Sequence, residues 1–208
     1  MSKGQKIVTV ALWAVLVLVM VGVVGVGAWD RLRAAKEKPL PVLFDTPAFS
    51  LIDQNDQPVS DQSLRGHPYV ASFIFVQCMG PCPLITGKLA QLQKMIANPN
   101  VKLISFSVDP AHDTPAVLKE YAARFSADSS RWHFLTGKPS DIYAAVNGMK
   151  IAMEPANANT PLVHSTRLLL VDGNGQVRGI YSTGEHADTE TLEAIAHDAN
   201  QLAGEKSR

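Results

Sequence analysis

Cysteine is the rarest residue in this chain: there are two in 208 residues, Cys78 and Cys82. The chain also lacks a net charge, because 19 basic residues balance 19 acidic ones, and it contains no repeat or low-complexity tract. The balance of charge excludes the basic surface typical of a nucleic-acid-binding protein. Both cysteines fall in one short stretch beside prolines, FIFVQCMGPCP, and this placement is the main chemical signal of the sequence.

Charged residues are absent from positions 7–28, a run of 22 residues rich in Val, Leu, Ala and Gly. As a helix rising about 1.5 Å per residue, this run spans roughly 33 Å, enough to cross a bilayer core. Basic residues flank it on both sides, so they do not fix its orientation. We predict a transmembrane anchor over residues 7–28, with residues 1–6 in the cytoplasm. The alternative, a cleaved signal peptide, usually has a shorter apolar region.

Proline and charge mark residues 29–47, which include the sequence KEKPLP, as a linker. Residues 48–208 then leave about 160 residues, enough for one domain with a real core and short for two. We therefore predict a single folded domain over residues 48–208.

Apolar periodicity within this domain predicts alternating strands and helices. Residues 69–76 and 101–108 are continuous apolar runs, as expected of strands buried on both faces. A helix follows each run, and Thr114 with Pro115 opens the second as N-cap and first turn. The remaining predicted elements are hairpins turning at residues 54–57 and 172–175 and helices over residues 140–149 and 189–202. The pattern predicts an α/β fold with helices around a mixed central sheet.

The two cysteines lie where the first buried strand ends and a helix begins, the end of an open α/β sheet at which sites are built. Pro83 suits the first helical position and places Cys82 near the N-cap, where the helix dipole lowers the pKa of a thiol. A disulfide closing so short a loop stabilises a fold by only about 2 kcal/mol. A purely structural disulfide is therefore not favoured, and buried inert cysteines are favoured still less because Gly80, Pro81 and Pro83 indicate a loop. A redox pair and a metal clamp stay open.

A soft metal ion held by two cysteines usually needs a third ligand, and histidine is the natural one. His164 precedes the first strand of the second hairpin and is the main candidate. His112, in the loop DPAHDTP after the second buried strand, is an auxiliary candidate at the same end of the sheet. Surface or packing roles are predicted for the others, which are His67, His133, His186 and His197.

Four features together resemble the Sco/SenC family: the N-terminal anchor, the Cys-x-x-x-Cys-Pro loop after an FIF strand, SVDPAHDTP, and a histidine ahead of a DGNG hairpin. The resemblance covers about residues 44–202 and implies a thioredoxin-like fold. It also implies that Cys78, Cys82 and His164 bind copper as Cu(I) and Cu(II), in agreement with the preference of thiolates for Cu(I). Asp109 matches an aspartate of the family, and we assign it to loop geometry or partner contact rather than to copper ligation.

The loop departs from the family pattern, usually Cys-Pro-Asp-x-Cys-Pro, because here it reads Cys-Met-Gly-Pro-Cys-Pro. The loss of the acidic residue is expected to make the thiols slightly more acidic. Met79 adds a thioether that is an auxiliary copper candidate, although an exposed loop methionine without such a role is the preferred interpretation. The two cysteine ligands are kept, and the identity of the partner is left open.

Two functions fit these features. The first is a membrane-anchored metallochaperone, rather than an enzyme, that delivers copper to the copper-bearing subunit of a respiratory oxidase or reductase. The second is a thiol–disulfide oxidoreductase that reduces the cysteines of such a partner, although redox loops usually have two residues between the cysteines instead of three. Both require a domain on the outer, periplasmic side of the cell membrane, where thiols change redox state. His164 discriminates between them, because only metal binding needs it.

Overall fold

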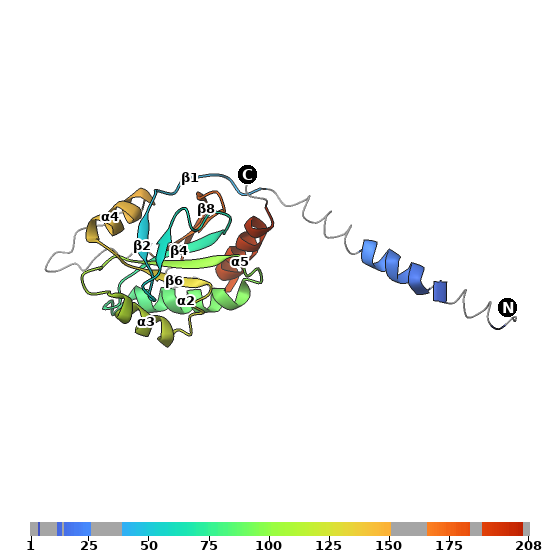
Figure 1. The fold of residues 1–208 in the computed structure, drawn as a ribbon, viewed down its shortest axis with the longest axis horizontal. Coiled ribbons are helices and arrows are strands. Elements are labelled where there is room, and N and C mark those ends of the chain that lie inside the picture. Colours follow the sequence, from blue (N-terminus) through green and yellow to red (C-terminus); the bar gives the residue numbers. More distant parts are fainter. Residues whose placement is uncertain are drawn as a thin grey trace. The chain divides into compact units, whose positions relative to one another are not determined.

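The computed structural model describes residues 4, 12–13, 15–25, 39–150, 166–183 and 189–205. The chain divides into two units, Met1–Pro39 and Leu40–Arg208. The second unit contains all the strands of the described residues (Figure 1). These strands are β1 (Phe44–Asp45), β2 (Ser50–Ile52), β3 (Pro58–Ser60), β4 (Tyr69–Ile74), β5 (Lys102–Ser107), β6 (Trp132–Leu135), β7 (Arg167–Val171) and β8 (Gln176–Ser182).

Six of the strands form a mixed sheet in the order β1-β8-β7-β4-β5-β6. β5 runs parallel to β4 and β6, whereas β7 is antiparallel to β4 and β8. Every residue of β4 is buried, as its continuous apolar sequence predicted. The mixed sheet and both predicted hairpins, β2–β3 and β7–β8, are confirmed.

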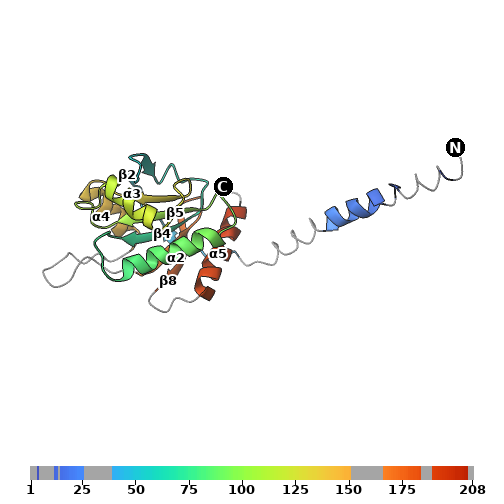
Figure 2. The same ribbon diagram turned by 90° about the horizontal axis from the view of Figure 1, so that it is seen from below.

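Helices cover both faces of this sheet. The helical crossovers between the parallel strands β4, β5 and β6 place α2 and α3 on one face (Figure 1), where Thr86 and Tyr121 hydrogen-bond to each other. α5 packs against α2 (Figure 2), and α4 contacts β2 on the other side of the sheet (Figure 1). The helices of this unit are α2 (Pro81–Met95), α3 (Pro115–Arg124), α4 (Pro139–Gly148) and α5 (Thr189–Gly204).

A small polar network crosses the centre of the sheet. The hydroxyls of Ser72 in β4 and Ser105 in β5 lie 2.8 Å apart, and Nε1 of Trp132 in β6 donates to Ser105 Oγ at 3.0 Å. All three residues are fully buried. Because each polar group has a partner, the network is compatible with the apolar core and holds β4, β5 and β6 in one register.

The folded unit begins at Leu40, earlier than the predicted domain start at residue 48. β1 falls inside the predicted linker, residues 29–47, and pairs with β8. The buried guanidinium of Arg178 in β8 donates to the carbonyl of Leu40 and forms an ion pair with Asp172 at 2.7 Å. β1 has only two residues, too few to show a periodic pattern in the sequence. It can be recognised as a strand only from its pairing with β8.

The β2–β3 turn contains a buried carboxylate with several hydrogen-bond partners. Asp53 accepts the backbone N–H groups of Asn55 and Gln57, and one of its oxygens lies 3.0 Å from His133 Nδ1. Burial by itself would raise the pKa of Asp53, but the hydrogen bonds from His133, Gln57 and Asn55 outweigh it and hold the pKa below its usual value. The folded state therefore favours the ionised carboxylate.

Acid is expected to weaken the fold through Asp53. Because its folded-state pKa lies below the unfolded value near 3.8, its contribution is complete above that value and is lost as the pH falls through the folded-state pKa. Urea denaturation at pH 7 and pH 3 should show a larger loss of unfolding free energy in the wild-type chain than in Asp53→Asn. Equal losses in the two proteins would contradict this assignment.

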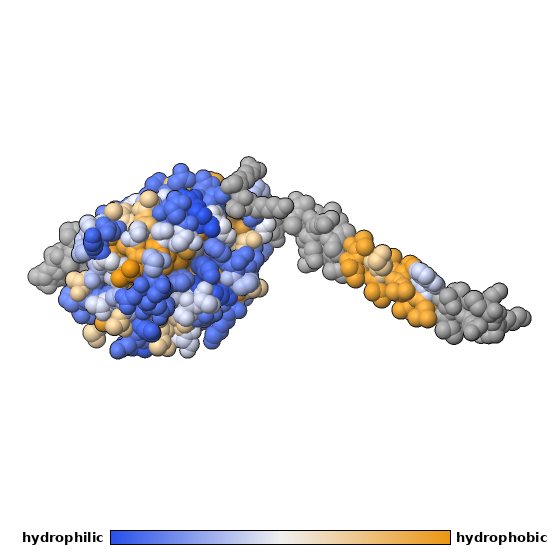
Figure 3. Space-filling model, in the orientation of Figure 1, coloured by the Kyte–Doolittle hydropathy of each residue, from blue (hydrophilic) through white to orange (hydrophobic). Residues whose placement is uncertain are grey.

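The first unit is described in part. Residues 15–25 are helical and expose apolar side chains (Figure 3). No helix formed by the described residues has the length and apolarity needed to cross a membrane. The predicted anchor, residues 7–28, lies partly outside the described residues and stays a prediction.

Candidate metal centre at the cysteine loop

The cysteine loop joins the end of β4 to the start of α2. α2 begins at Pro81, so Cys82 is its second residue, while Cys78 lies in the loop before it. Gly80 occupies the N-cap position, and no side chain caps the helix. The predicted helix start at Pro83 is wrong by two residues, because Pro81 also suits the first helical position and comes earlier.

Both cysteines are buried, although their loop is rich in glycine and proline. Cys78 is 5% exposed and Cys82 is 3% exposed, and both are free thiols. Burial raises the pKa of the Cys82 thiol to about 12, and the neighbouring Cys78 adds to the increase. The predicted lowering of the thiol pKa is wrong for Cys82, because desolvation outweighs the helix dipole.

Met79, between the two cysteines, has the opposite environment. Its side chain is 100% exposed, as preferred in the sequence interpretation. Leu84, on the first turn of α2, is also largely exposed. The thioether of Met79 is therefore not packed against the buried thiol pair.

The loop after β5 contributes a buried carboxylate that the sequence analysis did not single out. Asp113 is fully buried, and it accepts hydrogen bonds from the Ser107 hydroxyl at 2.6 Å and from the Val76 N–H at 3.2 Å. Burial raises the pKa of Asp113, and these two hydrogen bonds only partly oppose the increase. Asp113 thereby ties the loop after β5 to the start of the cysteine loop. Its place in SVDPAHDTP was the one signal available in the sequence.

Asp109 and His112 pair with each other at the surface. His112 Nδ1 lies 2.9 Å from an Asp109 carboxylate oxygen, and the His112 side chain is 62% exposed. The Asp109 carbonyl accepts the N–H groups of His112 and Asp113. These contacts agree with a role of Asp109 in loop geometry, and they leave His112 at the edge of the site rather than beside the buried thiols.

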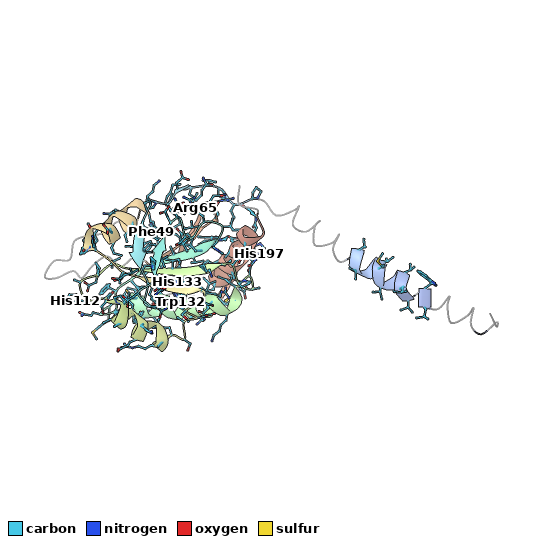
Figure 4. All side chains as sticks on the ribbon, viewed as in Figure 1. Phe49, Arg65, His112, Trp132, His133 and His197 are labelled. Atoms are coloured by element: carbon cyan, nitrogen blue, oxygen red, sulfur yellow. The ribbon has the colours of Figure 1, made fainter. Side chains whose placement is uncertain are left out.

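The other described histidines lie elsewhere. His133 pairs with Asp53, and His197 is on α5, toward the end of the unit opposite to His112 (Figure 4). His67 precedes β4 and is therefore at the other end of that strand from the cysteines. His186 lies outside the described residues.

A chain of two buried hydroxyls ends at the backbone carbonyl of Cys82. Thr86, one turn later in α2, donates to the carbonyl of Cys82 at 2.8 Å, and its oxygen lies 3.0 Å from the hydroxyl of Tyr121 in α3. Burial raises the pKa of Tyr121 to about 12, so this hydroxyl keeps its proton at neutral pH and can donate to Thr86. The sequence analysis missed both residues, because a threonine and a tyrosine within helices carry no distinguishing pattern.

The chain enters β7 at the edge of the sheet where β4 ends. β7 is antiparallel to β4, with Ala71 opposite Leu169, so the first residues of β7 lie beside the last residues of β4. The carbonyl of Thr166, just before β7, accepts the N–H and hydroxyl of Thr183 at 2.8 and 2.6 Å. His164, the predicted third ligand, lies outside the described residues.

Within the described residues, no group of three or more His, Cys, Asp or Glu side chains is arranged to hold a metal ion. Cys78 and Cys82 supply two buried sulfur donors, a set that suits Cu(I) or another thiophilic ion. The described residues thus supply two donors of the predicted soft metal site.

Comparisons with known proteins agree with this architecture. Residues 43–200 match the SCO1/SenC family model. The SCO1 protein homolog of Bacillus subtilis is 31% identical over 166 residues, which cover 78% of this chain and 86% of the relative. The solved structure of BsSco, described as a member of the Sco family of cytochrome c oxidase assembly proteins, has 30% identity and a TM-score of 0.70, covering 80% of this chain and 97% of its own. The copper-bound structure of ScoI from Bradyrhizobium japonicum has 25% identity and a TM-score of 0.65, covering 76% and 98%.

The mixed sheet covered by helices, with a cysteine pair where a central strand meets a helix, defines an α/β protein of the thioredoxin-like class. Within that class, the chain belongs to the SCO1/SenC family.

Proposed function

We propose that this chain is a copper-binding assembly factor that delivers copper to the copper centre of a cytochrome oxidase-type enzyme. Cys78, Cys82 and His164 are the proposed ligands. The observation that carries the proposal is the pair of buried, free thiols at the junction of β4 and α2, because two sulfurs select the soft ion Cu(I). The role is that of a metallochaperone, with copper as cargo, rather than that of an enzyme.

The relatives support copper as the cargo. ScoI from Bradyrhizobium japonicum has been solved with copper bound, and BsSco is described as belonging to a family of cytochrome c oxidase assembly proteins. The matching segments cover most of this folded unit and nearly all of those chains. A copper-bearing subunit of a respiratory oxidase or reductase is therefore the proposed partner.

Copper loading at these thiols is coupled to loss of protons. Because burial raises the pKa of Cys82 to about 12, this thiol is protonated at neutral pH and has to lose its proton as the ion binds. The bound cation then supplies the positive charge that a buried thiolate otherwise lacks.

The strand arrangement supports His164 as the third ligand. β7 starts at the edge of the sheet where β4 leads into the cysteine loop. Lys88, on α2, donates to the carbonyl of Thr183, which in turn holds Thr166 at the entry to β7. His164 is two residues before Thr166, so the chain is anchored close to α2 next to this position.

The proposed location is the cell (inner) membrane, with residues 7–28 as a single-pass anchor and the folded unit facing the periplasm or the outside. The uncharged run of 22 residues supports the anchor. A thiol pair that has to change redox state supports the outward orientation.

A second candidate function is thiol–disulfide exchange with the cysteines of the same partner. The presence of two free cysteines in one loop favours it, and BsSco is described as having a disulfide switch. In this case Cys78 and Cys82 suffice and His164 is not needed.

The deciding experiment is anaerobic titration of the reduced full chain with Cu(I), in competition with a calibrated chelator. We expect tight one-to-one binding by the wild-type chain. His164→Ala should weaken binding by more than about 100-fold, since removing a residue that merely orients a ligand already costs about 10–100-fold.

The control is His112→Ala, which removes an exposed imidazole at the edge of the site and should leave the affinity unchanged. Weak binding by the wild-type chain, indifferent to His164, would overturn the copper proposal. Thiol–disulfide exchange would then be the remaining function.

A further inference from the structure

The two arms of the cysteine loop are held by one segment, residues 113–121. At its start, Asp113 accepts the N–H of Val76 at 3.2 Å, two residues before Cys78. At its end, Tyr121 bonds to Thr86, which donates to the carbonyl of Cys82. The backbone therefore has one fixed point before the first cysteine and another at the second.

The hydrogen bonds at Cys82 have a defined direction. A carbonyl oxygen can only accept, so the Thr86 hydroxyl gives its proton to Cys82 O at 2.8 Å. The Tyr121 hydroxyl must then donate to Thr86 Oγ1, at 3.0 Å. This chain of two hydroxyls ends on the peptide group of a proposed ligand, and both residues are buried at 3% exposure or less.

The segment that carries both fixed points is itself rigid. Asp113 is held by the Ser107 hydroxyl at 2.6 Å, and Thr114 caps α3 by accepting the N–H of Val117. The ring of Tyr121 packs against Phe125, with ring centroids 5.0 Å apart. Tyr121 thus lies on α3, and Asp113 lies two residues before its start.

We propose that Asp113 and the Tyr121–Thr86 pair are positioning residues that form a clamp on the cysteine loop and set the separation of the two sulfurs. The residues of this clamp touch the backbone on either side of the cysteines and are not copper ligands. Its effect on copper affinity rests on the proposed function. The effect of the clamp on disulfide formation is independent of the proposed function, because a disulfide also requires the two sulfurs to be close.

Removing a hydroxyl from the clamp should lower both the affinity for Cu(I) and the tendency of the two cysteines to form a disulfide, and the reason is geometric. A loosened loop spends less time with its sulfurs close together, so a metal ion and a disulfide both become less favourable. Thr86→Val and Tyr121→Phe remove one hydroxyl each and keep shape and ring packing. Each should weaken Cu(I) binding by about tenfold, as is typical for residues that orient a ligand.

The second measurement is equilibration with dithiothreitol. Two protein thiols and oxidised dithiothreitol give one protein disulfide and reduced dithiothreitol, so atoms and electrons balance. Thr86→Val and Tyr121→Phe should lower the equilibrium constant for disulfide formation about tenfold, which corresponds to about 30 mV for two electrons.

Two further variants of the full chain complete the set. Thr86→Ser keeps the hydroxyl and should match the wild type in both measurements. Ser72→Ala removes a hydroxyl that is equally buried but hydrogen-bonds to Ser105 in the centre of the sheet. It should lower the melting temperature and leave both site measurements unchanged.

The outcomes separate the clamp from the proposed function. The clamp proposal is overturned if Thr86→Val and Tyr121→Phe have the Cu(I) affinity and disulfide equilibrium of the wild type. It is also overturned if Ser72→Ala changes these two quantities as much as they do. If the wild-type chain binds Cu(I) weakly, the copper function fails, while a shifted disulfide equilibrium in the two variants still supports the clamp.

Discussion

Replacing both cysteines with serine is expected to remove Cu(I) binding almost entirely. If each sulfur is worth at least about 100-fold in affinity, more than a residue that only orients a ligand, the double variant loses about 10⁴-fold. The physical reason is the softness of the donors, because a hydroxyl oxygen is a poor ligand for Cu(I). Anaerobic competition titration of Cys78→Ser/Cys82→Ser in the full chain is the measurement.

The matched control is Met79→Ala, which lies between the two cysteines and removes a fully exposed sulfur. Its affinity should equal that of the wild-type chain. A comparable loss in Met79→Ala would assign copper to the exposed thioether and contradict the buried site. Unaltered melting temperatures in both variants would show that the change lies in the ligands and not in the fold.

Asp113→Ala is expected to destabilise the folded unit by about 2–3 kcal/mol. The substitution leaves the Val76 N–H and the Ser107 hydroxyl without their carboxylate partner, and each unpaired buried donor costs about 1–3 kcal/mol. Part of this loss is offset, because burial disfavours the charge of Asp113, as its raised pKa shows. Urea denaturation at neutral pH measures the change in unfolding free energy.

Asp113→Asn separates the contribution of the Asp113 hydrogen bonds to stability from the contribution of its charge. Asparagine keeps one acceptor oxygen and has no charge, so it should cost less than alanine. Because the folded-state pKa of Asp113 is raised, its favourable contribution is present below the unfolded pKa and is lost as the pH rises through the folded-state value. Asp113→Asn should therefore become more stable relative to the wild type between pH 4 and pH 7. The opposite trend would show that the ionised carboxylate stabilises the fold.

Local patterns predicted the elements that carry the site. The apolar run at residues 69–76 has no alternation, which is typical of a strand buried on both faces, and β4 is that strand. Thr114 with Pro115 predicted the start of α3, and the threonine is its cap. Pro83 next to the second cysteine predicted a helix start, but α2 begins two residues earlier, at Pro81.

The sequence by itself determined the central strands, the hairpins, the helices and the place of the cysteine pair between strand and helix, because hydrophobic periodicity and turn residues act over a few neighbouring positions. It also pointed to the family through motifs that are continuous in the chain. Only the tertiary structure buries the two thiols in the core, and this burial raises the pKa of Cys82. The contacts of Asp113 with Val76 and of Tyr121 with Thr86 join residues about 35 positions apart. Such contacts have no local signature, since they exist only after the crossovers have brought α2, α3 and the strand ends together.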